Sequence, residues 1–232
     1  MSLFIITPPE PASLPIQGTE ARFPVRRIYC VGRNYLAHVR EMNEGGDERD
    51  PPFFFQKPLD AVVHDGGVVP YPSLTASLHY EVELVAAIAI GGANIPLATA
   101  LDHVLGYGVG LDMTRRDLQT IAKDKGWPWE MGKAFDHSAP LGMLVPANVT
   151  GHAPRNISLS VNGDVRQSSN TAQMTWSVTE VISKLSEHYR LEPGDVIMTG
   201  TPEGVGAVHI GDKIFAEVEG LPTLTITIGE KL

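Results

Sequence analysis

Cysteine is almost absent from this sequence of 232 residues, and basic residues are scarce relative to acidic ones. Cys30 is the only cysteine, so no disulfide can form within the chain, and its apolar neighbours predict a small core residue. The 18 lysines and arginines stand against 27 aspartates and glutamates, which gives a formal net charge of −9. A surface of that charge repels phosphate backbones. The composition therefore predicts no nucleic acid partner.

The sequence also lacks an uninterrupted apolar run long enough to span a membrane. Residues 84–101 contain no charged residue, but Gly91, Gly92, Asn94 and Pro96 interrupt them, which predicts a strand, a turn and the start of a helix. The first residues, MSLFIITPPEPASLP, have no charged segment followed by a long apolar one, as a secretion signal would. We therefore expect a soluble, cytoplasmic protein without a membrane partner.

Glycine and proline are abundant instead, with 23 and 18 residues, and they predict many turns between short elements. Strand patterns outnumber helical ones along the chain. This pattern favours a β-rich α+β fold over a doubly wound sheet or a helix bundle. We assign residues 1–25 to an N-terminal arm and residues 26–232 to a single domain.

Two acidic residues occupy one face of a predicted strand in the segment from Tyr80 to Ile90. Strand alternation places Glu81 and Glu83 on the face opposite Val82 and Leu84. Carboxylates that share a face can bind a hard divalent cation such as Mg²⁺ or Mn²⁺. The ordinary alternative for an isolated Glu-x-Glu pair is an exposed, charged strand face.

A second acidic position follows the glycine-rich segment LGYGVGLDM, which is expected to form a strand ending at Asp112. Thr114 then has the side chain of a helix N-cap, and the helix it would begin carries Arg116 and Gln119. Without knowledge of the fold, Asp112 adds only modestly to the hypothesis of a metal site.

The segment RIYCVGRNYLAHVREM predicts a short strand, a turn and a helix that begins near Asn34, a good N-cap residue. His38 and Glu41 lie one turn apart on that helix and could form a pair in which the glutamate orients an imidazole that activates water. An exposed ion pair on a solvated helix is the simpler alternative. Lys133, flanked by apolar residues, could stabilise an oxyanion or be an ordinary surface lysine.

Three further local signals help to place the elements. Residues 42–52 form a polar segment with glycine and proline that is typical of a functional loop, and we expect it to act as a lid. Asn162 and Gly163 between two strand patterns predict a tight hairpin. Ser177 and Glu180 form a capping-box pattern at the start of an amphipathic helix.

Taken in order along residues 26–228, five segments resemble the fumarylacetoacetate hydrolase family. These segments are RIYCVGRNYLAHVREM, HYEVELVAAI, GYGVGLDMTRRDLQ, the lysine in MGKAFD, and GDVIMTGTPEGVG. The first segment and LDMTRRDLQ are most similar to family members that cleave fumarylpyruvate in the degradation of aromatic compounds. Acylpyruvases and oxaloacetate decarboxylases are close behind. The chain resembles the shorter members, which lack an extra N-terminal domain.

The resemblance implies a mixed β-sandwich or roll with a few short helices, a homodimer, and one bound Mg²⁺ or Mn²⁺. It also implies roles for particular side chains. The metal ligands would be Glu81, Glu83 and Asp112; the water-activating pair His38 and Glu41; the group for an oxyanion or proton transfer Lys133; and the substrate contacts Arg116, Gln119 and Thr201.

The reaction that we infer from this resemblance is hydrolysis of the C3–C4 bond of a 2,4-diketo acid, here fumarylpyruvate, to fumarate and pyruvate. The alternatives are an acylpyruvase, an oxaloacetate decarboxylase, an isomerase of dienedioates, or a small-molecule-binding module without catalytic activity. A diacid substrate would need a cation at its far end. The sequence offers four candidates for that role without choosing among them: Arg33, Arg40, Arg115 and Arg116.

Overall fold

A mixed six-stranded sheet forms the centre of the protein in the computed structural model, which describes residues 4–42 and 49–231. Only the neighbouring strands β15 and β3 run parallel, and the other pairs are antiparallel. In spatial order the strands are β12 (Val145–Pro146), β9 (Val104–Leu111), β8 (Val82–Ile88), β15 (Asp195–Met198), β3 (Arg27–Gly32) and β4 (Phe53–Lys57).

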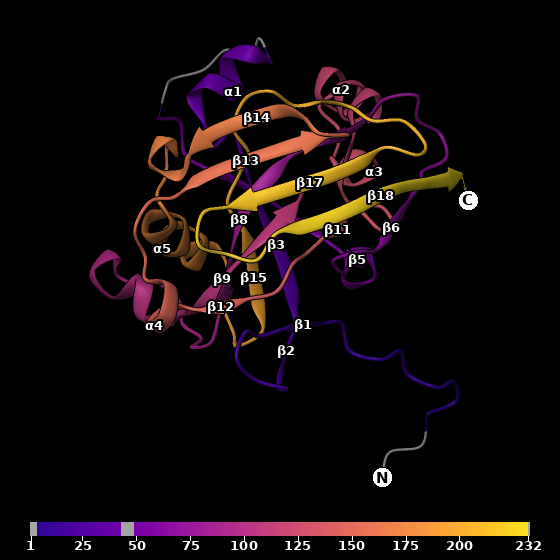
Figure 1. The fold of residues 1–232 in the computed structure, drawn as a ribbon. Coiled ribbons are helices and arrows are strands. Elements are labelled where there is room, and N and C mark those ends of the chain that lie inside the picture. The colour runs from indigo at the N-terminus through magenta and orange to yellow at the C-terminus, as the bar shows by residue number, and fades with distance from the viewer. Residues whose placement is uncertain (1–3, 43–48, 232) are drawn as a thin grey trace.

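A five-stranded sheet covers one face of the central sheet and lies in front of it in Figure 1. Apolar side chains from both sheets, among them Leu84, Val109, Leu159 and Ile214, belong to one buried cluster. The layers therefore form a sandwich with the main core between them. The second sheet has the order β14 (Asp164–Asn170), β13 (Asn156–Val161), β17 (Lys213–Val218), β18 (Leu224–Lys231) and β6 (Val68–Tyr71).

The other face of the central sheet is also buried, here by a hairpin near the N-terminus. Leu14 and Phe23 from this hairpin pack with Cys30, Val85 and Val196 of the central strands. Burial on both faces explains why β8 is apolar at nearly every position. The hairpin consists of β1 (Ser13–Pro15) and β2 (Arg22–Pro24).

Two small sheets lie outside the two larger ones. One has the order β10 (Thr114–Arg115), β7 (Leu78–Tyr80) and β16 (Gly206–Ala207), and the other pairs β11 (Ala139–Pro140) with β5 (Val62–Val63). The predicted hairpin at Asn162 and Gly163 is confirmed, because these residues join β13 and β14 with positive φ angles of 53° and 93°.

The helices are short and lie around the sheets (Figure 1). The capping box is confirmed, since Ser177 and Glu180 exchange side-chain and backbone hydrogen bonds at the start of α5. The α-helices are α1 (Leu36–Glu41), α2 (Arg116–Lys125), α3 (Glu130–Lys133), α4 (Ala147–Thr150) and α5 (Val178–His188). The 3₁₀ helices are η1 (Leu59–Ala61), η2 (Leu97–His103) and η3 (Thr171–Gln173).

Two predicted helix caps are wrong. Helix α1 begins one residue later than expected, with Tyr35 at its N-cap, and the Asn34 side chain bonds to distant backbone groups instead. Thr114 lies in β10, where its hydroxyl donates to the carbonyl of Asp112, and Arg115 takes the N-cap position of α2. In both cases tertiary hydrogen bonds outweigh the local capping preference.

The predicted fold class is confirmed, because strands dominate, helices are few and the two larger sheets form a mixed sandwich. The predicted membrane-span interruption is confirmed as well: residues 84–101 divide into β8, a turn and η2. Within the described residues, none of the helices has the length and apolar character needed to cross a membrane.

Candidate active site and metal centre

Three carboxylates meet at one end of the central strands. Glu81 precedes β8, Glu83 lies within it opposite Gly110 of β9, and Asp112 follows β9 directly. The backbone N–H of Asp112 donates to the carbonyl oxygen of Glu81 at 2.9 Å, which fixes the two strand ends together. Each carboxylate offers an oxygen within 4.8 Å of the other two, and each residue is at most 4% exposed. The alternative of an exposed, charged strand face is therefore wrong.

Three buried cations surround these carboxylates. The Lys133 ammonium donates to Glu81 at 2.6 Å, to Asp112 at 2.8 Å and to the Thr114 hydroxyl at 2.7 Å. Arg116 forms an ion pair with the second oxygen of Glu81, and Lys57 lies 2.8 Å from Asp112. Lys133 is only 3% exposed, so the alternative of a surface lysine is wrong.

The protonation states follow from this arrangement. Burial acts to raise the pKa of Glu81, but Lys133 and Arg116 outweigh it, and the pKa falls below its ordinary value. For Lys133, burial acts to lower the pKa, but Asp112 and Glu81 outweigh it and raise the pKa. Glu81 is therefore an anion at neutral pH, and Lys133 is a cation that can stabilise negative charge.

Glu83 lies in a different electrostatic environment. Burial, together with Asp112 and Glu81, raises its pKa well above the ordinary value. One oxygen accepts a hydrogen bond of 2.7 Å from the N–H of Gly200. Gly200 has a φ of +97°, and a Cβ atom there would approach the Cβ of Asn34 to 2.6 Å, so the position requires glycine. The sequence TGTPEGVG therefore supplies a backbone donor to the carboxylate cluster.

The carboxylate cluster has the donor set that a hard divalent cation prefers. One oxygen of Asp112, Oδ1, is buried and accepts no hydrogen bond from the described residues, although the Lys57 ammonium is close to it. Glu83 adds a carboxylate that lies close to the negative charges of Asp112 and Glu81. A cation among these oxygens would reduce that repulsion, so the residues fit a magnesium or manganese ion.

His38, on α1, lines the same pocket as the carboxylates, and Glu41 contacts its imidazole. The Nδ1 atom of His38 lies 3.4 Å from a Glu41 oxygen, and the His38 side chain is 13% exposed. Burial is the main cause that lowers the pKa of His38, and the nearby Arg116 adds to it. A neutral imidazole can accept a proton at pH 7.

The lid that we expect over Met42–Pro52 stays a prediction, because residues 43–48 lie outside the described part of the chain.

Glu41 is held from a second side. Both of its carboxylate oxygens lie 3.1 Å from the backbone N of Gly204, which donates to them. The loop after β15 thus contacts the site twice, through Gly200 at Glu83 and through Gly204 at Glu41. This loop links the carboxylate cluster to the histidine pair.

The three expected substrate contacts also line this pocket. Arg116 donates to Gln119 at 2.6 Å, so the two side chains form one unit beside Glu81. Thr201 accepts a hydrogen bond of 2.9 Å from Gln167, a fully buried residue of β14 that also accepts from the N–H of Val82. The candidate residues from five separate sequence segments therefore converge on one cavity.

Sequence reasoning missed four polar residues at this site. Lys57 and Gln167 are buried beside the expected residues, Asn34 binds the backbone that carries Gly200, and Lys123 lines the pocket. A weak signal existed for Lys57, which ends the apolar strand FFFQK, and for Lys123, which lies one turn after Gln119 on the same helix. Nothing in its local sequence distinguishes Gln167, because its partners lie far along the chain.

The fold and the site define a β-rich protein with a buried acidic centre and an adjacent histidine pair. Residues 27–229 match the family model described as fumarylacetoacetate (FAA) hydrolase C-terminal. The chain belongs to this family, as the five sequence segments predicted.

The similar proteins include fumarylpyruvate hydrolases and oxaloacetate tautomerases. A fumarylpyruvate hydrolase from a Ralstonia species is 46% identical over 177 residues, which cover 76% of this chain and 92% of the relative. An oxaloacetate tautomerase from Escherichia coli is 41% identical over 210 residues, 88% of this chain and 93% of the relative. The crystal structure of fumarylpyruvate hydrolase from Pseudomonas aeruginosa, in complex with Mn²⁺ and pyruvate, is 52% identical with a TM-score of 0.96. That match covers 99% of this chain and 100% of the other.

Proposed function

We propose that this protein is a metal-dependent hydrolase that cleaves fumarylpyruvate into fumarate and pyruvate in the degradation of aromatic compounds. The observation that carries the proposal is the convergence of three buried carboxylates and His38 on one pocket, with Glu41 in contact with the imidazole. The similarity to fumarylpyruvate hydrolases at 46% and 52% identity supports this choice of substrate.

Glu81, Glu83 and Asp112 would hold one Mg²⁺ or Mn²⁺, and the similar enzyme from Pseudomonas aeruginosa was solved with Mn²⁺ and pyruvate. When bound, such an ion supplies positive charge that stabilises developing negative charge on the oxygens of an α-keto acid. Arg116, Gln119 and Thr201 line the same pocket and would bind and orient that end of the substrate.

The remaining residues would move the protons. His38 is kept neutral by burial and held by Glu41. It takes a proton from a water molecule as the water oxygen attacks the C4 carbonyl. Lys133 stabilises the resulting oxyanion with its ammonium group, once one of its present acceptors binds another cation. The C3–C4 bond then breaks, its electron pair passes to the pyruvate half, and protonation at C3 completes the reaction.

A direct assay tests this proposal. Purified protein with Mn²⁺ should consume fumarylpyruvate, measured by the loss of its enol absorbance, and should release fumarate and pyruvate in equal amounts. Removal of the metal with EDTA should stop the reaction, and added Mn²⁺ should restore it. No turnover in the presence of metal, with an active reference enzyme in parallel, would overturn the substrate assignment.

Chemistry on oxaloacetate is the second candidate, because a tautomerase of that substrate is 41% identical to this chain. The decarboxylation expected from the resemblance and the tautomerisation in the relative's name both need a stabilised enolate but no attacking water. His38→Ala therefore separates hydrolysis from decarboxylation. The substitution should lower hydrolysis of fumarylpyruvate about a hundredfold or more while leaving a decarboxylase partly active.

We further propose that the protein is a cytoplasmic homodimer in which residues 26–232 form the catalytic domain and residues 1–25 an arm. The net charge of −9 and the single cysteine support the location, and the family resemblance supports the dimer. Light scattering should give twice the mass of one chain, whereas a value of one chain mass would overturn the dimer.

A further inference from the structure

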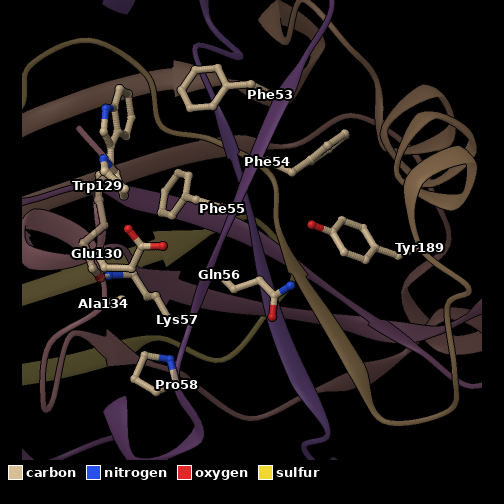
Figure 2. A pocket seen from close by; sticks show the side chains of 12 residues that line it. Phe53, Phe54, Phe55, Gln56, Lys57, Pro58, Trp129, Glu130, Ala134 and Tyr189 are labelled. Carbon is tan, nitrogen blue, oxygen red and sulfur yellow. Dashed lines mark hydrogen bonds between the residues drawn. The ribbon is translucent and has the colours of Figure 1, made fainter. Parts of the chain in front are cut away.

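Aromatic side chains line both the pocket of the candidate active site and a neighbouring surface cavity, and Phe55 and Trp129 belong to both. The residues Phe53 and Phe55 of β4 point to one side of the strand, where Trp129 joins them, and Phe54 points to the other side toward Tyr189 (Figure 2). The ring centroids of Phe53 and Trp129 lie 4.8 Å apart at nearly a right angle, and those of Phe55 and Trp129 lie 5.9 Å apart. We call Phe53, Phe55 and Trp129 the aromatic wall.

Three cations lie against this wall, one on each ring. The Lys133 nitrogen is 5.3 Å from the centre of Phe55, the Lys123 nitrogen is 5.5 Å from the centre of the Trp129 ring, and the Arg33 guanidinium is 5.9 Å from the centre of Phe53. Lys133 contacts the carboxylate cluster. Arg33 and Lys123 line the same pocket. The wall therefore carries positive charge beyond the metal centre.

The other arginines considered from the sequence are less suitable for a second anionic group. Arg116 is engaged with Glu81 and Gln119 at the metal centre. Arg115 packs over Phe135 with its guanidinium 4.4 Å from the ring centre, away from the residues that line the pocket. Arg40, on α1, is not among the residues that line the pocket. Of the four arginines, Arg33 is therefore the best placed to bind a second anionic group. Lys123, which lines the same pocket, is a further candidate.

The backbone holds Arg33 in an unusual conformation. Its φ is 60°, in the left-handed region that costs a residue with a side chain about 1 kcal/mol or more. Beside it, the Phe53 ring occupies the space next to Gly32, where a Cβ atom would lie 2.0 Å from the ring. The strand end is therefore shaped so that Phe53 packs on the backbone and Arg33 lines the pocket.

We propose that Arg33 and Lys123 form the subsite that binds the distal carboxylate of the substrate, and that they give the enzyme its preference for diacids over monoacids. This inference rests on the proposed function. The flat, conjugated chain of a fumaryl group would then extend along Phe55 and Trp129, from Lys133 at the reacting carbonyl to the two outer cations.

The charges of the two residues agree with this role. Burial is the main cause that lowers the pKa of Lys123 to about 8, and Arg33 and Lys133 lower it further. Lys123 is therefore still mainly protonated at pH 7. A carboxylate bound between Lys123 and Arg33 would offset the repulsion between the two cations and accept charge-assisted hydrogen bonds from both.

A pair of substrates and a matched pair of lysine variants test the subsite. Lys123→Met keeps a long apolar side chain against Trp129 but removes the charge. Lys125→Met is the control, because Lys125 lies on the same helix and its nitrogen is 4.4 Å from the ring of another tryptophan, Trp127. Arg33→Asn tests the second cation, since asparagine tolerates a left-handed backbone.

With Mn²⁺ present, Lys123→Met and Arg33→Asn should each lower kcat/KM for fumarylpyruvate about tenfold to a hundredfold, mainly through KM. For acetylpyruvate, in which a methyl group replaces the distal carboxylate arm, the same variants should stay within about twofold of the unchanged protein. Lys125→Met should leave both values unchanged. Equal losses with the two substrates, or no loss with fumarylpyruvate, would overturn the subsite.

Binding of the product separates this inference from the proposed function. Calorimetry with the Mn²⁺-loaded protein should show that Lys123→Met weakens fumarate binding about tenfold, while Lys125→Met does not. If the unchanged protein cleaves neither diketo acid, the proposed function fails, but weakened fumarate binding would still support the subsite. Unchanged fumarate affinity in both Lys123→Met and Arg33→Asn would overturn it.

Discussion

The carboxylate cluster and His38 line one pocket, but the protein supports the cluster and the His38–Glu41 pair in opposite ways. Glu81, Glu83 and Asp112 project from the ends of central strands that are buried on both faces. His38 and Glu41 belong to a helix of six residues that has no fully buried residue and no side-chain cap. The helix is attached to the site through the hydrogen bond from Gly204 to Glu41.

The electrostatic environments of the two regions differ as well. In the cluster, buried cations pair with Glu81 and Asp112, and these ion pairs hold the positions and charges of the two carboxylates. In the pair, burial lowers the pKa of the His38 imidazole, which lies next to a carboxylate that is 37% exposed. We infer that the cluster sets where negative charge is stabilised, and that the pair sets which reaction uses it. Substitutions in the two regions should therefore change metal affinity and catalysis in different ways.

The largest effect is expected from Glu83→Gln. This substitution keeps the shape of the side chain and its acceptor for the Gly200 N–H but removes one ligand charge. We expect kcat/KM to fall about a thousandfold, since losing several kcal/mol of charge stabilisation corresponds to that factor. Calorimetry should also show weaker Mn²⁺ binding. Glu217→Gln, at an exposed position of β17, is the control. Activity within tenfold of normal, with unchanged metal affinity, would contradict the assignment of this cluster.

His38→Ala should have a smaller and more selective effect. General-base catalysis contributes about a hundredfold or more, so hydrolysis should fall by at least that factor. The affinity for Mn²⁺ should stay unchanged, because His38 is not part of the carboxylate cluster. His209→Ala, at an exposed histidine, controls for loss of an imidazole elsewhere. A parallel loss of metal affinity and activity would mean that the two regions are not separable.

The sequence predicted the cluster more readily than its surroundings. Strand alternation alone placed Glu81 and Glu83 on one face, because that periodicity is a local property of the chain. Asp112 joined them as the third ligand only through the family resemblance, since its position depends on the pairing of β8 with β9. The NG hairpin and the capping box were also predicted, because both are formed by residues close in sequence.

The side chains that hold the site together could not be predicted in this way. Gln167 bonds to Val82 and Thr201 from 85 and 34 residues away, and Asn34 bonds to Trp176 and Thr199 from 142 and 165 residues away. Such contacts depend on which loops the fold brings together. The incorrect N-cap at Asn34 has the same origin, because its amide satisfies long-range backbone groups rather than the first turn of α1.

The smallest expected effect is that of Glu41→Gln, which tests how the pair works. The hydrogen bond that His38 donates to Glu41 raises the pKa of His38 against the larger, opposing effect of burial. Removing the carboxylate charge should therefore shift the acid limb of the kcat/KM profile to lower pH, because imidazole then protonates less readily. At pH 8, where His38 is neutral in both proteins, kcat should fall only about threefold to tenfold, as expected for a partly exposed pair.

The matched control for this prediction is Glu187→Gln, which removes the charge of another i,i+3 pair, the one with Lys184 on α5. That variant should leave the pH profile unchanged. If Glu41 only anchored α1 to the loop at Gly204, Glu41→Gln would lower kcat at every pH without moving the acid limb. An unmoved limb would therefore show that Glu41 orients the helix rather than the imidazole proton, and would reduce the pair to a single catalytic histidine.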